Sequence, residues 1–248
     1  MPVAGLPEIE AGCDLGALLV DVLRPLAPRN GDILVVAHKV ISKAEGALVD
    51  LRDVTPSQEA LDLAARLDRD ARRIEVVLRE STEVLRVKPP RGERMGVLIC
   101  RHRLGMVCAN AAVDESNVPG ADTVLLLPRD PDESARRLRE ALRKGLGVEM
   151  GVVVADTFGR PWRVGLVNVA IGLAGVPAVL DVRGQTDRSG RLLRATVPAV
   201  ADELAAAAGL CMEKAAGVPA VLVRDFHWEV ATDSARLLLR SKEEDLFL

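Results

Sequence analysis

A carboxylate and a hydroxyl follow a strongly apolar segment in the middle of the chain. Residues 152–155 are apolar and mostly β-branched, a pattern typical of a buried strand, and Asp156 and Thr157 come directly after them. We expect the strand to end there, so that rigid backbone holds both side chains at a crevice. Carboxylate and hydroxyl oxygens are ligands of the kind that Mg²⁺ or Mn²⁺ prefers. The alternative is an ordinary polar turn in which Asp156 is a turn residue or helix cap.

The residues just after this pair favour the chemical interpretation. Arg160, Trp162 and Arg163 crowd a short polar stretch before a second apolar run at 166–171. A guanidinium group binds carboxylates and phosphates in a fixed geometry. The two arginines could therefore hold an anionic substrate against a metal ion.

A second apolar segment also leads into polar residues. Residues 32–37 have the pattern of a buried strand, and His38, Lys39 and Lys43 follow. Two lysines at a strand end can bind phosphates, although solvated surface lysines are more common. A lone histidine is more often structural than catalytic.

Further oxygen ligands come from two other segments. Asp114 and Asn117 follow an apolar stretch and precede a Pro-Gly turn, and Glu213 lies near the end of a predicted apolar helix over 198–214. Each could join a metal site; for Glu213, an ordinary helix-end carboxylate is the alternative. The sequence thus offers several carboxylates to one divalent cation.

The elements that must position these side chains alternate between strands and helices. Helices are predicted from periodicity and capping residues, and strands from short apolar or alternating runs. The predicted helical stretches cover residues 14–23, 56–87 (with a second helix over 71–85), 132–145 and 198–214, with a charged helix from 233. The predicted strands cover 32–37, 97–100, 106–108, 123–127, 152–155, 166–171, 178–180, 192–196 and 220–223.

The composition excludes several classes of protein. The 248 residues are 49% hydrophobic, and 33 basic and 36 acidic residues leave a net charge of −3, which argues against nucleic-acid binding driven by bulk charge. No apolar run is long enough to span a membrane and no leader segment is evident, so we expect a cytoplasmic protein. The four cysteines form no C-x-x-C pair, which argues against a zinc site.

Familiar nucleotide and catalytic motifs are missing from the sequence. It contains no G-x-x-x-x-G-K-[ST], no G-x-G-x-x-G, no H-E-x-x-H and no G-x-S-x-G. Any nucleotide must therefore bind in a non-standard cradle. From the residues alone we predict an α/β protein that binds a divalent metal and an anionic ligand.

Several short segments, taken together, indicate a protein family. They are Gly-Asp-Ile-Leu-Val-Val at 31–36 with Val-Ile-Ser-Lys-Ala-Glu-Gly at 40–46, Cys-Ala-Asn-Ala with Val-Asp-Glu-Ser-Asn-Val at 108–118, Asp-Thr-Phe-Gly-Arg-Pro-Trp-Arg at 156–163 and Ala-Asp-Glu-Leu-Ala at 201–205. In this order, over nearly the whole chain, they resemble the coenzyme F420-0:L-glutamate ligase family.

The resemblance implies a fold and an activity. Enzymes of this family use GTP and a divalent metal to add L-glutamate to the lactyl carboxylate of coenzyme F420-0, and then further γ-linked glutamates. The implied fold is α+β, a two-part mixed α/β fold particular to the family, assembled as a homodimer. We expect residues 1–248 to form a single catalytic unit, with two subdomains as an alternative. We expect no reductase-like C-terminal domain of the kind that some relatives carry.

The resemblance also assigns residues. The implied ligands of two Mg²⁺ or Mn²⁺ sites, with K⁺ as a further candidate cation, are Asp114, Asp156, Thr157 and Glu213. The implied GTP contacts are Leu6, Pro7, Glu8, Ile9, His38, Lys39, Lys43, Asn117, Cys211, Met212, Glu213, Lys214, Ala215, Ala216, Gly217 and Val218.

Roles in the reaction follow from its chemistry. GTP would convert an unreactive carboxylate into an acyl phosphate, which the amine of glutamate would attack. Lys43 and Asp156 are the expected catalytic residues, with Lys43 clamping phosphate. Arg160 and Arg163 are expected to bind the acidic F420 precursor.

Two departures leave other functions open. His38-Lys39 stands where small hydroxyl residues are usual in the family, and Met212 stands where a glycine is expected. A metal-dependent nucleotide phosphohydrolase is one alternative, and a non-catalytic protein that binds the F420 precursor is another.

Overall fold

A five-stranded mixed sheet forms the core of the larger part of the structure. The structure is a computed structural model, and it describes residues 1–93, 95–118, 120–212 and 217–245. In spatial order the strands of this sheet are β1 (Pro2–Val3), β10 (Ala220–Val223), β2 (Ile33–Ala37), β8 (Gly151–Arg160) and β9 (Arg163–Ala174). Strands β2 and β8 run parallel, and all other neighbours are antiparallel.

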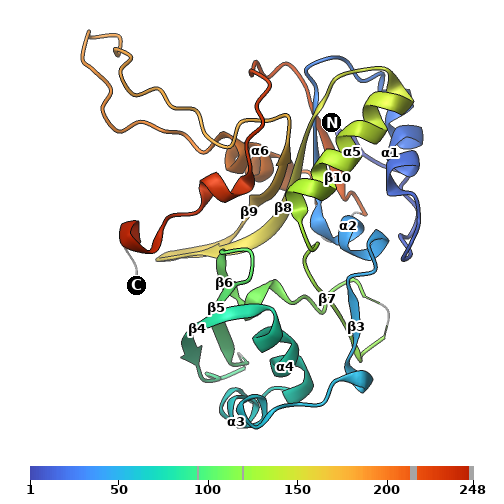
Figure 1. The fold of residues 1–248 in the computed structure, drawn as a ribbon, viewed down its shortest axis with the longest axis vertical. Helices are drawn as coiled ribbons and strands as arrows, with labels where there is room; N and C mark the ends of the chain where they lie inside the picture. Colours follow the sequence, from blue (N-terminus) through green and yellow to red (C-terminus); the bar gives the residue numbers. More distant parts are fainter. Residues whose placement is uncertain (94, 119, 213–216, 246–248) are drawn as a thin grey trace.

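The central sheet is buried on both faces. Alternate residues of β2 and β8 enter two separate apolar clusters, with Val36 in one and Val35 in the other. Helices α1 (Leu15–Leu23) and α5 (Pro131–Leu146) cover one face, and α6 (Val200–Gly209) covers the other (Figure 1). Burial on both faces explains why these strands are continuous apolar runs in the sequence.

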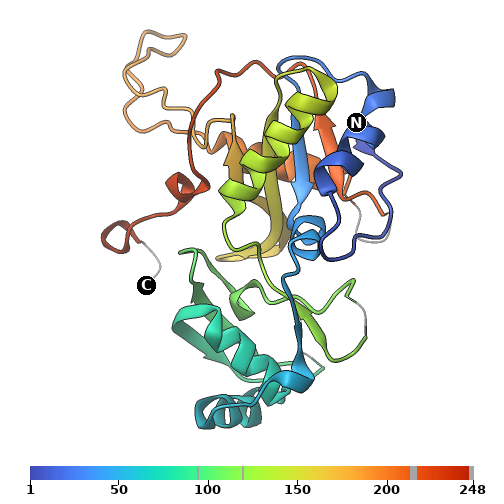
Figure 2. The same ribbon diagram turned by 45° about the vertical axis from the view of Figure 1, so that its right-hand side comes forward.

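A smaller part of the chain folds beside the central sheet around its own apolar cluster (Figure 2). Its elements are α3 (Gln58–Leu67), α4 (Ala71–Arg79) and the three-stranded sheet β4 (Ser81–Lys88), β5 (Val97–His102) and β6 (Val107–Ala109). The chain enters and leaves this part through the antiparallel pair β3 (Leu48–Asp50) and β7 (Thr123–Leu125). The expected mixed α/β class is confirmed.

The remaining elements are short. Helix α2 (His38–Ala44) follows β2 directly, and single 3₁₀ turns occur at η1 (Arg24–Leu26), η2 (Leu51–Asp53), η3 (Asn110–Ala112), η4 (Ala235–Leu238) and η5 (Lys242–Glu244). Across the described ranges, no helix combines the length and the apolar character needed to cross a membrane.

Several predicted elements differ from the structure. The helix predicted over 71–85 ends at Arg79, and residues 81–88 form β4 because they pair with β5. The helix predicted to reach residue 214 ends at Gly209, and the charged helix predicted from 233 is reduced to η4 and η5. Residues 178–180 and 192–196 form no strand. Long-range pairing overrides local propensity in the first case.

A bulge in the β8–β9 pairing is held by carboxylates from two helices. Val154 pairs with Gly172 but Ala155 pairs with Ala170, so Ile171 is the extra residue. The Ala170 N–H donates to Asp202 Oδ1 of α6 at 2.9 Å, and the Leu173 N–H donates to Asp132 Oδ1 of α5 at 2.8 Å. Polar groups that the bulge leaves unpaired are therefore satisfied by side chains.

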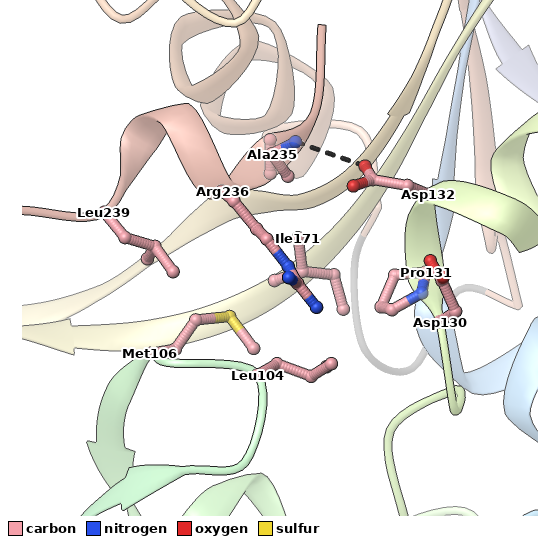
Figure 3. A pocket seen from close by; sticks show the side chains of 10 residues that line it. Leu104, Met106, Asp130, Pro131, Asp132, Ile171, Ala235, Arg236 and Leu239 are labelled. Atoms are coloured by element: carbon pink, nitrogen blue, oxygen red, sulfur yellow. Dashed lines mark hydrogen bonds between the residues drawn. The ribbon is translucent and has the colours of Figure 1, made fainter.

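Asp132 also fastens the C-terminal segment to the sheet. Its Oδ1 accepts the Ala235 N–H at 3.1 Å (Figure 3). Ser234 Oγ donates to its Oδ2 at 2.6 Å. The same region lines a partly open cavity of only about 30 Å³ beside Arg236, room for about one water molecule. This cavity is part of the packing between α5, β9 and η4.

A cluster of polar side chains connects the end of β5 to the end of α4. Leu104 N donates to His102 Nδ1, so Nε2 of this fully buried ring carries the proton and faces Glu80 Oε2 at 3.2 Å. Arg103 Nε donates to the same oxygen at 2.9 Å. Burial raises the pKa of Glu80, but the hydrogen bonds from His102 and Arg103 outweigh it, so this pKa lies below its usual value.

We predict that Gly172→Ala destabilises the protein. An added Cβ would lie 2.4 Å from the Pro131 carbonyl oxygen, so β9 and α5 would have to separate. Such overpacking costs about 1–3 kcal/mol of the free energy of unfolding, which urea denaturation measures. Gly159→Ala, on the same hairpin, is the matched control, because no atom of the described residues lies within 4 Å of the added Cβ. Equal stability of the two variants would contradict the close contact.

We predict that Glu80→Gln lowers stability in a pH-dependent way. A carboxyl whose folded pKa is depressed contributes stability above its unfolded pKa of about 4.3 and loses it as pH falls through the folded value. The loss relative to wild type should be about 1–2 kcal/mol at pH 7 and should shrink below about pH 4. Urea denaturation between pH 3 and pH 7 measures it, with exposed Glu229→Gln as control; a pH-independent loss would refute the prediction.

Candidate functional site

A cavity of about 800 Å³ lies beyond the carboxyl end of β2. Strand β2 ends at Ala37, which pairs with Ala155, but β8 continues to Arg160 because β9 still pairs with its other edge. The edge of β8 that carries Asp156 and Thr157 is therefore open to the cavity. The prediction that the strand ends at Asp156 is wrong; its parallel neighbour ends instead. Crevices at the carboxyl ends of strands are common ligand sites in open α/β sheets.

Asp156 and Thr157 reach this cavity from opposite faces of the sheet. Successive side chains alternate along a strand, so Asp156 faces α2 and Thr157 faces α6. Asp156 Oδ1 lies 3.3 Å from His38 Nε2, and Thr157 Oγ1 donates to Asn168 Oδ1 at 3.0 Å. The open edge allows both side chains to line the same space.

His38 is buried at the floor of the cavity. Its Nδ1 lies 3.1 Å from Ser42 Oγ, whereas its Nε2 has no hydrogen-bond partner among the described residues. Buried polar atoms are rarely left unsatisfied. An unpaired ring nitrogen beside the Asp156 carboxylate therefore fits a site that a ligand completes.

Lys39 and Lys43 lie one helical turn apart on α2 and both line the cavity. Lys39 Nζ contacts Asp114 Oδ2 and the Ser116 hydroxyl, and Lys43 Nζ contacts Glu8. The Lys43 side chain is 9% exposed, whereas that of Glu8 is 80% exposed. Each ammonium group thus has a carboxylate partner that an incoming anion could replace.

Asp114 is ionised but lies behind Lys39, outside the lining of the cavity. Burial raises its pKa, yet the hydrogen bond from Lys39 and the Ser116 N–H at 2.7 Å outweigh this and lower the pKa below its usual range. The chain reaches Asp114 through Asn110–Ala112, whose φ angles of 50°, 48° and 54° are all left-handed. This conformation is costly for residues other than glycine, and such strain is concentrated at functional sites.

Most of the site residues implied by the resemblance surround this cavity. Those that line it are Leu6, Pro7, Glu8, Ile9, His38, Lys39, Lys43, Asn117, Asp156, Thr157, Met212, Gly217 and Val218. Cys211 is half-buried outside the lining. Glu213, Lys214, Ala215 and Ala216 lie outside the described residues. The roles assigned to all these residues stay predictions.

The two arginines of the β8–β9 turn do not line the cavity. Arg160 Nη2 donates to the Val164 carbonyl at 3.2 Å within the hairpin, which ends at the left-handed Trp162. Their expected role in binding an anionic substrate thus has no support from the cavity itself.

Sequence reasoning missed two side chains near Asp156 and Thr157. Asn168 lines the cavity, and the available signal was that it is the single polar residue in the apolar run 166–171. Cys108 is buried nearby, where burial and the charge of Asp156 raise the pKa of its thiol to about 12. This thiol therefore stays protonated and cannot act as a nucleophile near neutral pH.

The oxygen donors of the cavity fit a hard divalent cation. Among the described residues no group of three or more His, Cys, Asp or Glu side chains is arranged to hold a metal. Mg²⁺ is commonly bound by one or two carboxylates together with substrate phosphates and water, so Asp156 and Thr157 suit such a partial site. The unpaired nitrogen of His38 agrees with a site that is completed by a ligand.

Comparisons with known proteins all point to one family. The family model described as F420-0:Gamma-glutamyl ligase matches residues 5–225. The Coenzyme F420:L-glutamate ligase of Methanopyrus kandleri is 45% identical, over 99% of this chain and 96% of that protein. The proteins of the same name from Methanothermobacter thermautotrophicus and Natronomonas pharaonis are 44% and 46% identical, over 99% of this chain and 96% and 93% of their own lengths.

We predict that Lys39 and Lys43 make the cavity a binding site for polyphosphate, and that the Glu8 carboxylate competes with phosphate for Lys43. Lys43→Met should weaken binding of tripolyphosphate about tenfold, because a charge-assisted hydrogen bond is lost. Glu8→Gln should strengthen it by up to about fivefold, because Lys43 is released from its carboxylate. Isothermal titration calorimetry measures both affinities. Lys144→Met, which removes an exposed lysine paired with Glu140 on α5, is the control; weakening by that variant to the same degree would indicate non-specific attraction.

Proposed function

Because the chain belongs to the F420-0:gamma-glutamyl ligase family, we propose that it is a GTP- and metal-dependent ligase that adds L-glutamate to the lactyl carboxylate of coenzyme F420-0, and further glutamates through γ-linkages. The observation that carries the proposal is the cavity at the end of β2. Two lysines of α2 line it together with the Asp156 carboxylate and the Thr157 hydroxyl, which lie on the part of β8 that extends beyond the end of β2.

The chemistry needs an activated carboxylate. An oxygen of the lactyl carboxylate attacks the γ-phosphorus of GTP, the bond to the bridging oxygen breaks, and GDP leaves. The amine of glutamate then attacks the carbonyl carbon of the acyl phosphate, phosphate departs with the electron pair, and the amine proton passes to solvent. Holding the reactants together contributes the orientation part of the rate enhancement.

The lysines of α2 are suited to the phosphate groups. Lys43 is nearly buried, so its interaction with phosphate is weakly screened, and it would exchange Glu8 for the transferred phosphoryl group. Lys39 would exchange its contacts with Asp114 and Ser116 in the same way. Their positive charges would offset the charge that develops during transfer.

The same four residues that the family resemblance implies are the proposed cation ligands. Asp114, Asp156, Thr157 and Glu213 would hold Mg²⁺ or Mn²⁺, with K⁺ as a further candidate. A bound divalent cation would neutralise charge on the phosphates and orient them. When Lys39 leaves Asp114, that carboxylate becomes available as a ligand.

We also propose that two copies of this chain form a homodimer through the β8–β9 hairpin. The tip of the β8–β9 hairpin presents Trp162 at 80%, Val164 at 100% and Leu166 at 61% exposure. Apolar side chains gathered on a projecting ribbon are typical of an interface between subunits. A second copy of this chain would cover them.

Mass spectrometry of the reaction products tests the function. The purified protein is incubated with F420-0, GTP, L-glutamate and Mg²⁺ or Mn²⁺. We expect F420 species with one or more added glutamyl residues, formed only when both GTP and glutamate are present. GTP hydrolysis that ignores glutamate would instead indicate a phosphohydrolase, and binding of F420-0 without turnover would indicate a non-catalytic protein.

An Asp156→Asn variant tests whether the reaction depends on a metal ion held by Asp156, and Asp187→Asn is its control. Asp156→Asn should lose at least about a hundredfold in product formation while its unfolding curve stays close to that of wild type. Asp187→Asn, in the exposed loop before α6, should retain activity. Full activity of Asp156→Asn at saturating metal would remove Asp156 from the proposed site.

A further inference from the structure

Thr157 and Asn168 form a directly opposed cross-strand pair beside the cavity. They are partners in the β8–β9 register, on the face that α6 covers, and Thr157 Oγ1 lies 3.0 Å from Asn168 Oδ1. Both line the cavity. Nothing in the family resemblance assigned a role to Asn168.

The chemistry of the neighbouring sulfur determines which way the Asn168 amide faces. Asn168 Nδ2 lies 3.8 Å from Met212 Sδ, and a thioether can only accept a hydrogen bond. The amide nitrogen therefore faces Met212 and the amide oxygen faces Thr157. Because that oxygen has no hydrogen, the Thr157 hydroxyl must be the donor.

Close packing holds Asn168 in this position. Gly209, the last residue of α6, lies against it, and a Cβ at Gly209 would be 2.9 Å from Asn168 Cγ. Two residues further along β9, the Ala170 N–H donates to Asp202 at the other end of α6. Both ends of α6 therefore contact this stretch of β9 and hold it in place.

We propose that Asn168 is a positioning residue that fixes the Thr157 hydroxyl for a divalent cation. With its hydrogen committed to Asn168, Thr157 Oγ1 can offer only lone pairs to a group in the cavity, as a metal ligand must. A freely rotating hydroxyl would spend part of its time with its hydrogen toward the cation. The inference rests on the proposed function, in which Thr157 is a metal ligand.

Mn²⁺ binding tests the inference without turnover. Electron paramagnetic resonance measures the Mn²⁺ affinity of the full chain in the presence of GTP, and the relevant site is the one that Thr157→Val weakens. Asn168→Ala should weaken Mn²⁺ at this site about tenfold to a hundredfold, the usual effect of removing a residue that orients a metal ligand. Asn168→Asp retains an acceptor for the Thr157 hydroxyl and should retain the affinity; it also keeps the test available if the alanine variant fails to fold.

A double-variant cycle separates positioning from general structural support. On a Thr157→Val background, Asn168→Ala should change Mn²⁺ affinity no further, because Asn168 acts only through the hydroxyl. Asn30→Ala, which removes a side-chain acceptor of the Glu149 N–H far from the cavity, is the control and should bind as wild type does.

The results distinguish this inference from the proposed function. Additive losses in the cycle, or an unchanged affinity in Asn168→Ala while Thr157→Val weakens binding, would overturn the positioning role and leave the ligase standing. If Thr157→Val weakens no Mn²⁺ site, the inference fails together with the metal role of Thr157, whereas glutamate addition to F420-0 is still decided by mass spectrometry.

Discussion

The unequal length of two parallel strands is the constraint on which the candidate site depends. Strand β2 stops opposite Ala155, while β8 continues because β9 still satisfies its other edge. The open edge carries Asp156 and Thr157, and α2 begins at the same level and brings His38, Lys39 and Lys43 to it. The pairing of β8 with β9 therefore positions the oxygen donors, and α2, which follows β2 directly, brings the positively charged lysines to them.

Half-buried carboxylates on the covering helices keep this arrangement rigid. Asp132 of α5 and Asp202 of α6 accept backbone N–H groups of β9 on the two sides of its bulge. Burial raises the pKa of Asp202, which the Ala170 N–H only partly offsets. A buried carboxylate is costly unless it is hydrogen-bonded, so these positions tie the helices to one register of the hairpin.

The sequence predicts the interior of the fold better than its extensions. Strands β2, β8, β9 and β10 and helices α1 and α5 are recognisable because burial on a regular face leaves a clear period. Strand β4 was mistaken for helix because only its pairing with β5 specifies it, and the continuation of β8 past Asp156 depends on β9. Asn168 was missed because its function depends on a cross-strand neighbour and on α6, neither of which local sequence shows.

The side chains of Asp156 and Thr157 point to opposite faces of the sheet, and this limits where residues can be inserted in β8 and the β8–β9 turn. Residues added at the turn beyond Arg160 would lengthen the exposed ribbon and leave both side chains in place. A single residue inserted between the bulge and Asp156 would exchange their faces, placing the carboxylate toward α6 and the hydroxyl toward His38. Natural variation in loop length should therefore be found at the hairpin tip, while the four residues from Val154 to Thr157 keep a fixed spacing.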